Sequence, residues 1–255
     1  MKTIELYNFL NNAIPSSLCC EWDNDGLMCC PDKGREINRA LITLDITADA
    51  VEYAKQGGFD VIISHHPLIF KGIKSITPDA CVSAKAIELI RSGISAMSFH
   101  TRLDALSGGV NDMLAKKLGV KNTVAFGADG EEIGRIGELD KPMALSEFAR
   151  LVKDALGAPA VLCADAGKQV KKVALLGGEG GDDIAAAAAA GADTYVSGRL
   201  GYHAMTDAPE CGMNLIEAGH FYTEFPVCQR LAEVVASADA GIECEIFFSN
   251  KIQLI

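Results

Sequence analysis

Two patterns of apolar residues alternate along the first part of the chain. Residues 3–14 carry apolar side chains at helical spacing and stop before Pro15, which predicts an amphipathic opening helix. Unbroken apolar runs at residues 39–45 and 59–64 predict buried strands, and residues 49–56 between them predict a helix. This order is a β-α-β unit, which implies a parallel sheet covered on both faces.

The same order of elements returns in the second half of the chain. Residues 173–177 again predict a buried strand, and residues 183–190 predict an alanine-rich helix. Residues 191–197 then repeat the frame G-x-D-x-x-x-S of residues 58–64. An internal repeat of this kind decides the fold class, so we expect an α/β protein built from two similar halves.

We expect two α/β domains, residues 1–127 and residues 128–255, each with a mixed, largely parallel sheet. The C-terminal part of the chain is expected to pack back on the first domain. Residues 127–140, rich in glycine and acids, are expected to form the crossover, and Ser146 to cap the helix that follows.

Composition and charge exclude several classes of protein. With 49% hydrophobic and 22% charged residues, the chain is in the globular range. Residues 128–255 hold 10 of the 23 basic and 20 of the 34 acidic side chains, and this excess of acids argues against nucleic-acid binding. The longest apolar run, residues 184–192, is far shorter than the ~20 residues of a membrane span.

The nine cysteines bear on the compartment. The first twenty residues show no basic segment followed by an apolar core, so we expect a cytoplasmic protein with reduced thiols. No C-x-x-C occurs. The adjacent pairs at residues 19/20 and 29/30 leave a zinc site open as an alternative, although this spacing fits no usual zinc knuckle.

Chemistry is most clearly indicated by histidines at strand ends. His65 and His66 follow a predicted strand and precede Pro67, at a point where both rings can turn toward one centre or serve two neighbouring ions. The alternative is one core and one surface histidine. Strands are also predicted at residues 94–99 and 213–218, and the other three histidines, His100, His203 and His220, likewise fall at or just beyond predicted strand ends.

Two of these histidines have an acid four residues later. His100 with Asp104 and His220 with Glu224 recur in the two halves, a spacing that puts both side chains on one face of a helix. Imidazole and carboxylate are ligands of zinc, iron, manganese and cobalt. Together with the adjacent histidines, the repeated pairs predict a centre of two divalent transition-metal ions, although a surface hydrogen bond is the alternative for each pair.

Other motifs are weaker. Residues 177–181 (GGEGG) lie between a strand and a helix but lack the spacing of a phosphate loop, so a tight turn is the better interpretation. No G-x-S-x-G elbow occurs. Residues 21–27 (EWDNDGL) contain the only tryptophan, and they are either a capped turn or the lip of a pocket.

Several of these motifs together resemble the Nif3-like family of dinuclear-metal proteins, also called DUF34 and GTP cyclohydrolase 1 type 2 homologues. The resemblance covers nearly the whole chain through five segments: EWDNDGL, ISHHPLIF, FHTRLDALSGGVND, GRIGEL and EAGHFYTE. It implies two α/β domains with the metals in the cleft between them, and a homohexameric toroid. The metal ligands implied by the resemblance are His65, His66, Asp104, His220 and Glu224, with His100 beside them.

The expected function is a metal-dependent hydrolase of a nucleotide or related small molecule, with Glu224 and Asp104 as its catalytic carboxylates. The alternative is a protein that stores, delivers or senses metal without turnover. The sequence differs from the family pattern at one position, because Arg199 in Ser197-Gly198-Arg199 replaces the acid that is usual there. Arg199 and His203 are candidates for groups around the ligands, and for Arg199 the alternative is a salt bridge to a nearby acid.

Overall fold

The computed structural model describes residues 1–128 and 130–255, which form two compact units. Unit 1 comprises Met1–Leu103 and Val227–Lys251, and unit 2 comprises Asp104–Pro226 and Ile252–Ile255. The expected boundary after residue 127 therefore lies inside unit 2. Asp129, in the segment predicted as the crossover, lies outside the described residues.

Unit 1 is built on a mixed sheet of five strands in the order β1-β4-β3-β2-β11. β1 pairs with β4 in antiparallel fashion, and the other neighbours are parallel. The strands are β1 (Gly26–Cys29), β2 (Arg39–Thr43), β3 (Val61–Ser64), β4 (Ser95–Ser98) and β11 (Glu243–Phe247). The C-terminal strand β11 thus lies beside β2 in the first unit rather than in the second.

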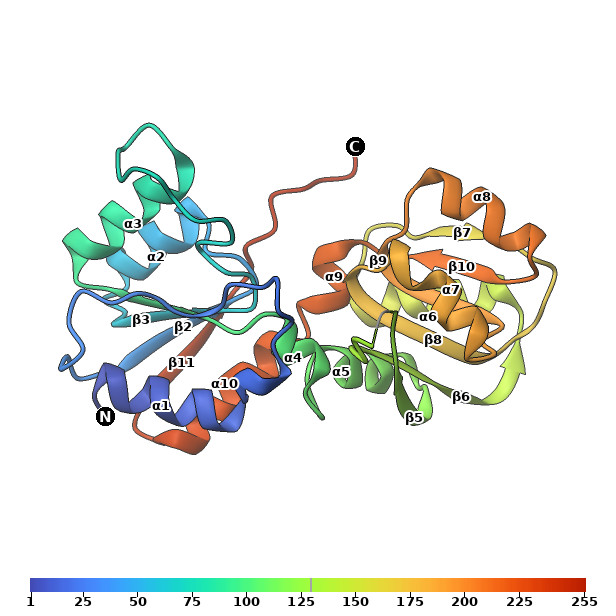
Figure 1. Cartoon of the computed structure of the whole chain (residues 1–255), viewed down its shortest axis with the longest axis horizontal. Coiled ribbons are helices and arrows are strands. Elements are labelled where there is room, and N and C mark those ends of the chain that lie inside the picture. Colours follow the sequence, from blue (N-terminus) through green and yellow to red (C-terminus); the bar gives the residue numbers. More distant parts are fainter. Residues whose placement is uncertain (129) are drawn as a thin grey trace. The chain divides into compact units, whose positions relative to one another are not determined.

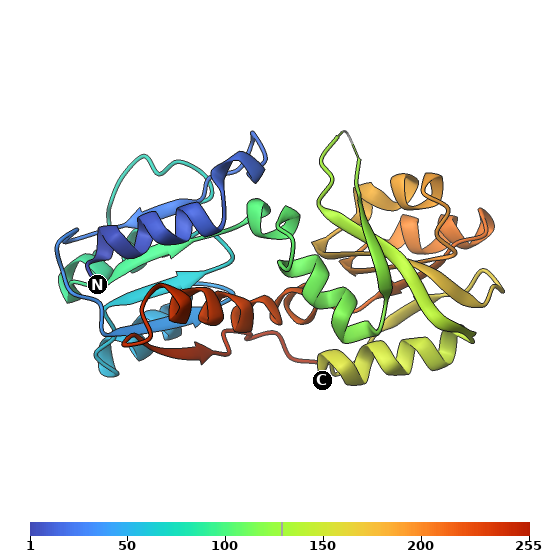
Figure 2. The same cartoon turned by 90° about the horizontal axis from the view of Figure 1, so that it is seen from below.

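Helices cover both faces of this sheet. α2 and α3 lie on one face, while α1 and α10 lie side by side on the other (Figure 1, Figure 2). The helices that include unit 1 residues are α1 (Thr3–Ala13), η1 (Ser16–Leu18), α2 (Ala48–Gln56), α3 (Cys81–Ser92), α4 (Thr101–Ala105) and α10 (Val227–Ala238). The α1 face that is buried carries Leu6 and Leu10. Lys2 occupies the N-cap position of α1.

Unit 2 has a mixed sheet of six strands in the order β5-β6-β8-β9-β10-β7, in which β8, β9 and β10 are parallel. The strands are β5 (Lys121–Phe126), β6 (Gly134–Met143), β7 (Leu162–Ala164), β8 (Val170–Glu179), β9 (Thr194–Arg199) and β10 (Asn214–Glu217). The helices are α5 (Val110–Leu118), α6 (Leu145–Leu156), η2 (Gly181–Asp183), α7 (Ile184–Ala189), α8 (Tyr202–Glu210) and α9 (His220–Glu224).

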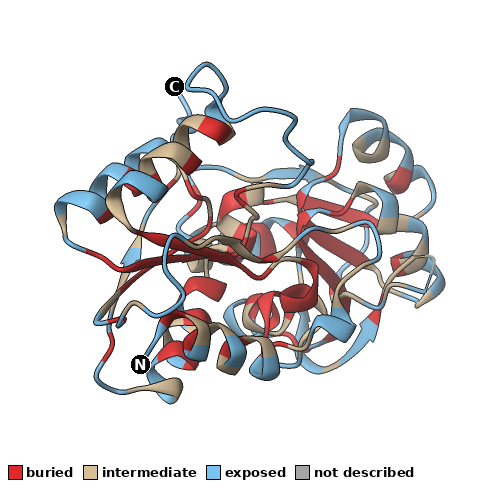
Figure 3. Cartoon of the chain, turned by 60° about the vertical axis from the view of Figure 1, so that its left-hand side comes forward, coloured by how far each residue is buried: buried red, intermediate tan, exposed pale blue. Residues whose placement is uncertain are grey.

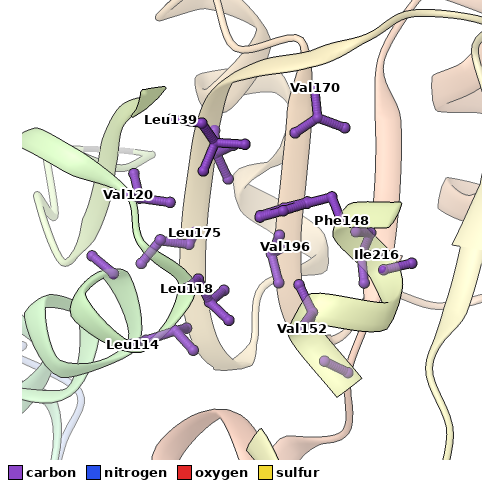
Figure 4. Close-up of a cluster of buried hydrophobic side chains, with 14 of the residues drawn as sticks. Leu114, Leu118, Val120, Leu139, Phe148, Val152, Val170, Leu175, Val196 and Ile216 are labelled. Atoms are coloured by element: carbon purple, nitrogen blue, oxygen red, sulfur yellow. The ribbon is translucent and has the colours of Figure 1, made fainter. Parts of the chain in front are cut away.

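The alternation of side chains along β8 supplies two cores. Val173 and Leu175 belong to a cluster with side chains of α5 and α6 (Figure 4). Ala174 and Leu176 point to the opposite face and join a second cluster with α7 and α8. Because consecutive strand residues face opposite sides of a sheet, one apolar run serves both layers. Figure 3 shows the result, with buried strands and helices that are exposed on their outer sides.

The internal repeat is present in the structure. Neighbouring parallel strands follow the chain as β2-β3-β4 in unit 1 and as β8-β9-β10 in unit 2, as two similar halves require. The repeated aspartate has the same task in both. Asp60 accepts hydrogen bonds from the backbone N–H of Asn38 and Arg39, and Asp193 accepts them from Lys171 and Lys172. Each carboxylate thus anchors the start of the neighbouring strand.

Two local predictions are wrong. Residues 134–139, expected in the crossover, lie in β6, which pairs with β5 as an antiparallel hairpin. Ser146 lies inside α6, whose N-cap is Ala144, because the side chain of Glu147 already accepts from the Ala144 N–H. Among residues 1–128 and 130–255, no helix combines the length and the apolar character that crossing a membrane requires.

Candidate metal centre

Three histidines of unit 1 converge at the carboxyl ends of adjacent parallel strands. His65 and His66 follow β3, and His100 follows β4. Each offers a ring nitrogen within 4.8 Å of the others. The ring centroids are 5.0 Å apart for His65 and His66, and 5.3 Å apart for His65 and His100. The loops beyond these strand ends are where an open α/β sheet normally binds its ligands.

In each ring, Nδ1 faces an oxygen. His65 Nδ1 lies 3.0 Å from the carbonyl oxygen of Phe99, and His66 Nδ1 lies 2.7 Å from Asp45 Oδ1. His100 Nδ1 lies 2.8 Å from Asp23 Oδ1. Because a carbonyl or carboxylate oxygen only accepts, the proton of the neutral ring is on Nδ1, and Nε2 carries the lone pair that a metal ion would bind.

The strand backbone positions the adjacent histidines. The His65 N–H donates to Thr43 O and the His66 N–H donates to Leu44 O, so both residues continue the pairing of β3 with β2. His65 is completely buried, while the side chain of His66 is 21% exposed. The interpretation as one core and one surface histidine fails because both rings belong to one cluster.

The EWDNDGL segment braces His100 and the residues that follow it. Asp23 accepts hydrogen bonds from His100 Nδ1, from the Thr101 N–H and from the Thr101 hydroxyl. Burial disfavours its charge, but the hydrogen bonds from His100 and Thr101 outweigh burial and hold the pKa of Asp23 well below its usual range. An ionised carboxylate therefore faces His100 at neutral pH.

A buried ion pair secures the other side of the same segment. Asp25 Oδ2 accepts from the His100 N–H and from Arg102 Nε, the latter at 2.7 Å. Arg102 is 1% exposed and also donates to Asn11 Oδ1 and to Ile14 O. Both charges have partners, as burial requires. The segment therefore holds His100 in place through the hydrogen bonds of Asp23 and Asp25. Side-chain-to-backbone contacts such as that of Asp25 with the His100 N–H fit the interpretation of the segment as a capped turn.

Unit 2 carries a second group of candidate ligands on α9. His220 opens this helix after β10, and Glu224 ends it. The i, i+4 spacing brings His220 Nε2 to 3.1 Å from Glu224 Oε2, with Glu224 5% exposed. The predicted pairing of these two side chains on one helical face is therefore present.

The glycine pair of β8 makes room for this group. A Cβ at Gly178 would lie 2.2 Å from Glu224 Oε1 and 3.2 Å from His220 Nε2. A Cβ at Gly177 would lie 3.1 Å from Glu224 Cγ. The function of the GGEGG segment is thus to let α9 approach the strand closely, a role that its spacing alone did not reveal.

The same glycines do not form a phosphate loop. The Gly177 N–H donates to Asn111 Oδ1, and the Gly178 N–H donates to Thr223 Oγ1. The Gly180 N–H donates to Arg199 O. A phosphate loop needs such groups for its anion, so that interpretation does not fit. The tight-turn prediction is also wrong, because residues 177–179 lie in β8 and Gly181 begins η2.

Asp104 differs from the simple H-x-x-x-D prediction. His100 precedes α4, so His100 and Asp104 do not share a helix face, although Asp104 itself lies in α4 and is 7% exposed. The sheet register pairs Ser64 with Ser98 and Ser197 with Glu217. Because Ser64 and Ser197 occupy the same position of the repeated frame, their partners Ser98 and Glu217 are equivalent. Three residues later, Thr101 corresponds to His220, so His100 and His220 are not equivalent positions.

Two candidates for surrounding groups lie on the surface of unit 2. Arg199 Nη1 is 3.4 Å from Glu179 Oε2, and both side chains are exposed. Arg199 therefore forms the salt bridge to a nearby acid that was the alternative to a role beside the ligands. His203 is exposed on α8, where its ring packs edge-on against Tyr202. It belongs to none of the groups of potential ligands found among the described residues.

Among the described residues the cysteine pairs show no zinc knuckle, and none of the nine cysteines there forms a disulfide. Cys19 lies beside Asp23 and Asp25, with its ligand atom within 4.8 Å of theirs. Burial, together with these two charges, raises the pKa of the Cys19 thiol to about 11. A protonated thiol is a poor ligand and a poor nucleophile.

The donors of both units fit divalent transition metals. Unit 1 offers three imidazoles held in the ligand tautomer, and unit 2 offers an imidazole and a carboxylate over a glycine cradle. Sequence reasoning missed Asp45 and Asp23, the carboxylates that orient His66 and His100. Asp45 lies two residues beyond the end of β2, and an acid just past a strand end is the signal that could have found it.

Comparison with known proteins agrees with this set of motifs. A family model described as Duf34/NIF3 (NGG1p interacting factor 3) matches residues 1–254. A protein of Clostridium perfringens named GTP cyclohydrolase 1 type 2 homolog is 35% identical over 249 residues, covering 95% of this chain and 95% of its own. The Protein NIF3 homolog of Schizosaccharomyces pombe is 33% identical over 253 residues, covering 91% and 89%.

Solved structures confirm the fold class. The crystal structure of the Staphylococcus aureus hypothetical protein SA1388 matches with a TM-score of 0.90 and 28% identity, covering 100% of this chain and 99% of that one. Reduced HcgD from Methanocaldococcus jannaschii matches with a TM-score of 0.83 and 28% identity, covering 96% and 97%. The predicted pair of mixed α/β sheets is shared with these proteins.

Proposed function

We propose that this chain, which belongs to the Duf34/NIF3 family, is a metal-dependent hydrolase of a nucleotide or related small molecule. Its ligands would be His65, His66, Asp104, His220 and Glu224, which together would hold two divalent ions, with His100 beside them. The observation that carries the proposal is the set of three imidazoles whose Nδ1 atoms are all engaged by oxygen acceptors.

Two bound divalent ions would supply Lewis acidity and a hydroxide source at neutral pH. The chain's own residues prepare the site for them. Asp45 and Asp23 keep the protons of His66 and His100 on Nδ1, so that Nε2 faces outward from each brace. Glu224, whose Oε2 lies next to His220 Nε2, and Asp104 would supply the two carboxylates.

The choice of substrate is supported by the names of the relatives. Two relatives that are 35% and 33% identical to this chain are named GTP cyclohydrolase 1 type 2 homolog. Opening the ring of a purine nucleotide requires water to attack an electrophilic carbon, which is chemistry that a hydrolytic metal centre provides.

We further propose a ring of six chains, which sedimentation velocity would detect as a single species of hexameric mass.

The first test measures metal content. Protein purified without added metal should contain about two transition-metal ions per chain by elemental analysis, and the double variant His65→Ala/His220→Ala should lose most of them. His203→Ala is the matched control, because it removes an exposed histidine that belongs to no ligand group. Full metal content in the double variant would show that the ligand assignment is wrong.

The second test measures turnover. A screen of nucleotides and phosphoesters should find a substrate that is hydrolysed repeatedly, with activity lost on chelation and restored by metal. Glu224→Gln and Asp104→Asn should abolish this activity in protein that remains folded. Retention of metal with no turnover on any substrate would contradict the hydrolase and favour the metal-handling alternative.

A further inference from the structure

Two large aromatic side chains stand exposed beside His100. Trp22 is 56% exposed and Phe70 is 45% exposed. The Trp22 ring lies 6.2 Å from Phe70 and 6.4 Å from His100, and Phe70 lies 6.0 Å from His100, measured between ring centroids. The planes meet at 77°, 81° and 83°, so the three rings form a corner of nearly perpendicular planes.

The corner is held together by polar contacts from two distant segments. Asn24 Nδ2 donates to Ile69 O, which ties the Trp22 turn to the loop that carries Phe70. Asp23, the residue after Trp22, accepts from His100 Nδ1. Edge-to-face contacts between the rings add to this arrangement. The positions of Trp22 and Phe70 are therefore fixed by hydrogen bonds of the neighbouring residues Asp23, Asn24 and Ile69.

Exposed aromatic rings of this size need an explanation. Rings that serve packing are usually buried, and a cluster of exposed ones usually marks a binding surface. The loop from Phe70 to residue 80 is exposed throughout, and it carries Lys71 and Lys74 directly after the ring. In a chain with a net charge of −11, two lysines in the exposed loop that follows Phe70 favour an anionic ligand.

We propose that Trp22 and Phe70 form a binding lip for a planar heteroaromatic ring, with Lys71 and Lys74 binding an anionic group of the same molecule. The inference rests on the proposed function in one respect, because it places this ring next to the histidines that would hold the metal. Every aromatic heterocycle has a π-face, so stacking selects for a planar ring without requiring a particular base.

The experiment uses the fluorescence of Trp22, because it is the only tryptophan of the chain. Metal-loaded protein is titrated with guanosine 5′-monophosphate, with ribose 5-phosphate, and with inorganic phosphate. The nucleotide should quench the emission to saturation, whereas ribose 5-phosphate, which lacks only the ring, should bind at least tenfold more weakly. Equal affinity for the two compounds would overturn the proposal.

Variants then locate the binding surface. Phe70→Ala keeps the fluorescent reporter and should weaken nucleotide binding roughly tenfold. Ile76→Ala is the matched control, since Ile76 is 59% exposed in the same loop and is not aromatic. Unchanged nucleotide affinity in Phe70→Ala, or an equal loss in Ile76→Ala, would contradict the ring-binding lip.

Failure of the lip and failure of the hydrolase give different results. Phe70→Ala should keep the metal content of the unmodified protein and raise KM, with kcat changed less than KM. If ring-selective quenching is found in a protein without turnover, the lip stands and the hydrolase fails. If turnover depends on metal while KM is the same in Phe70→Ala, the hydrolase stands and the lip fails.

Discussion

Gly178→Ala tests whether the glycine cradle of β8 positions Glu224. The added Cβ would lie 2.2 Å from Glu224 Oε1, whereas ordinary contacts begin at 3.4 Å. The carboxylate must therefore retreat by more than about 1 Å, and Glu224 is only 5% exposed, so it has little space to do so. The side chain of His220, with Nε2 3.2 Å from the same Cβ, is also affected.

Two effects of this substitution can be separated. Gly178 has a φ of +72°, a conformation that costs alanine about 1–2 kcal/mol of unfolding free energy. Displacement of Glu224 is a distinct effect, and losses of this kind typically weaken metal binding about 10- to 100-fold. The control is Gly167→Ala, because Gly167 has a φ of +73° with nothing within 4 Å of its Cβ.

Urea unfolding of the metal-free proteins would measure the first effect, and competition with a chromophoric chelator would measure the second. Both variants should lose the unfolding free energy that the backbone conformation costs, and Gly178→Ala should lose a further ~1–3 kcal/mol because its Cβ is overpacked against Glu224. Only Gly178→Ala should lose metal affinity. Equal metal affinity in the two variants would refute the reasoning that the cradle positions Glu224.

Two further predictions concern ionisation in unit 1. Burial raises the pKa of Asp60, but hydrogen bonds from the Asn38 N–H and from Arg35 outweigh it, so the pKa is lowered. The stabilisation is therefore present above the unfolded value of about 4 and is lost as the pH falls through the folded value. Asp60→Asn should cost about 1–3 kcal/mol of unfolding free energy at pH 7, and this difference should shrink below about pH 4; a difference that grows in acid would contradict it. The thiol of Cys19, whose pKa burial raises to about 11, should react with iodoacetamide at pH 8 more slowly than exposed Cys211, as peptide mapping would measure.

The sequence was sufficient for the parts of the fold that local patterns encode. Apolar runs predicted the parallel strands β2, β3 and β8, because a strand buried on both faces needs apolar residues at nearly every position. The frame G-x-D-x-x-x-S predicted the repeat, because the carboxylates of Asp60 and Asp193 perform the same backbone task. The identity of the candidate ligands came from resemblance to a family as well as from spacing.

Only the tertiary structure decided which groups support these residues. Asp45 and Asp23 lie 21 and 77 residues from the histidines they orient, and no periodicity joins positions so far apart. The return of β11 to the first sheet depends on pairing with β2, more than 200 residues earlier, so composition cannot locate the unit boundary. The correspondence of His220 with Thr101 follows from sheet register, which is fixed by hydrogen bonds between strands and not by the order of residues along one strand.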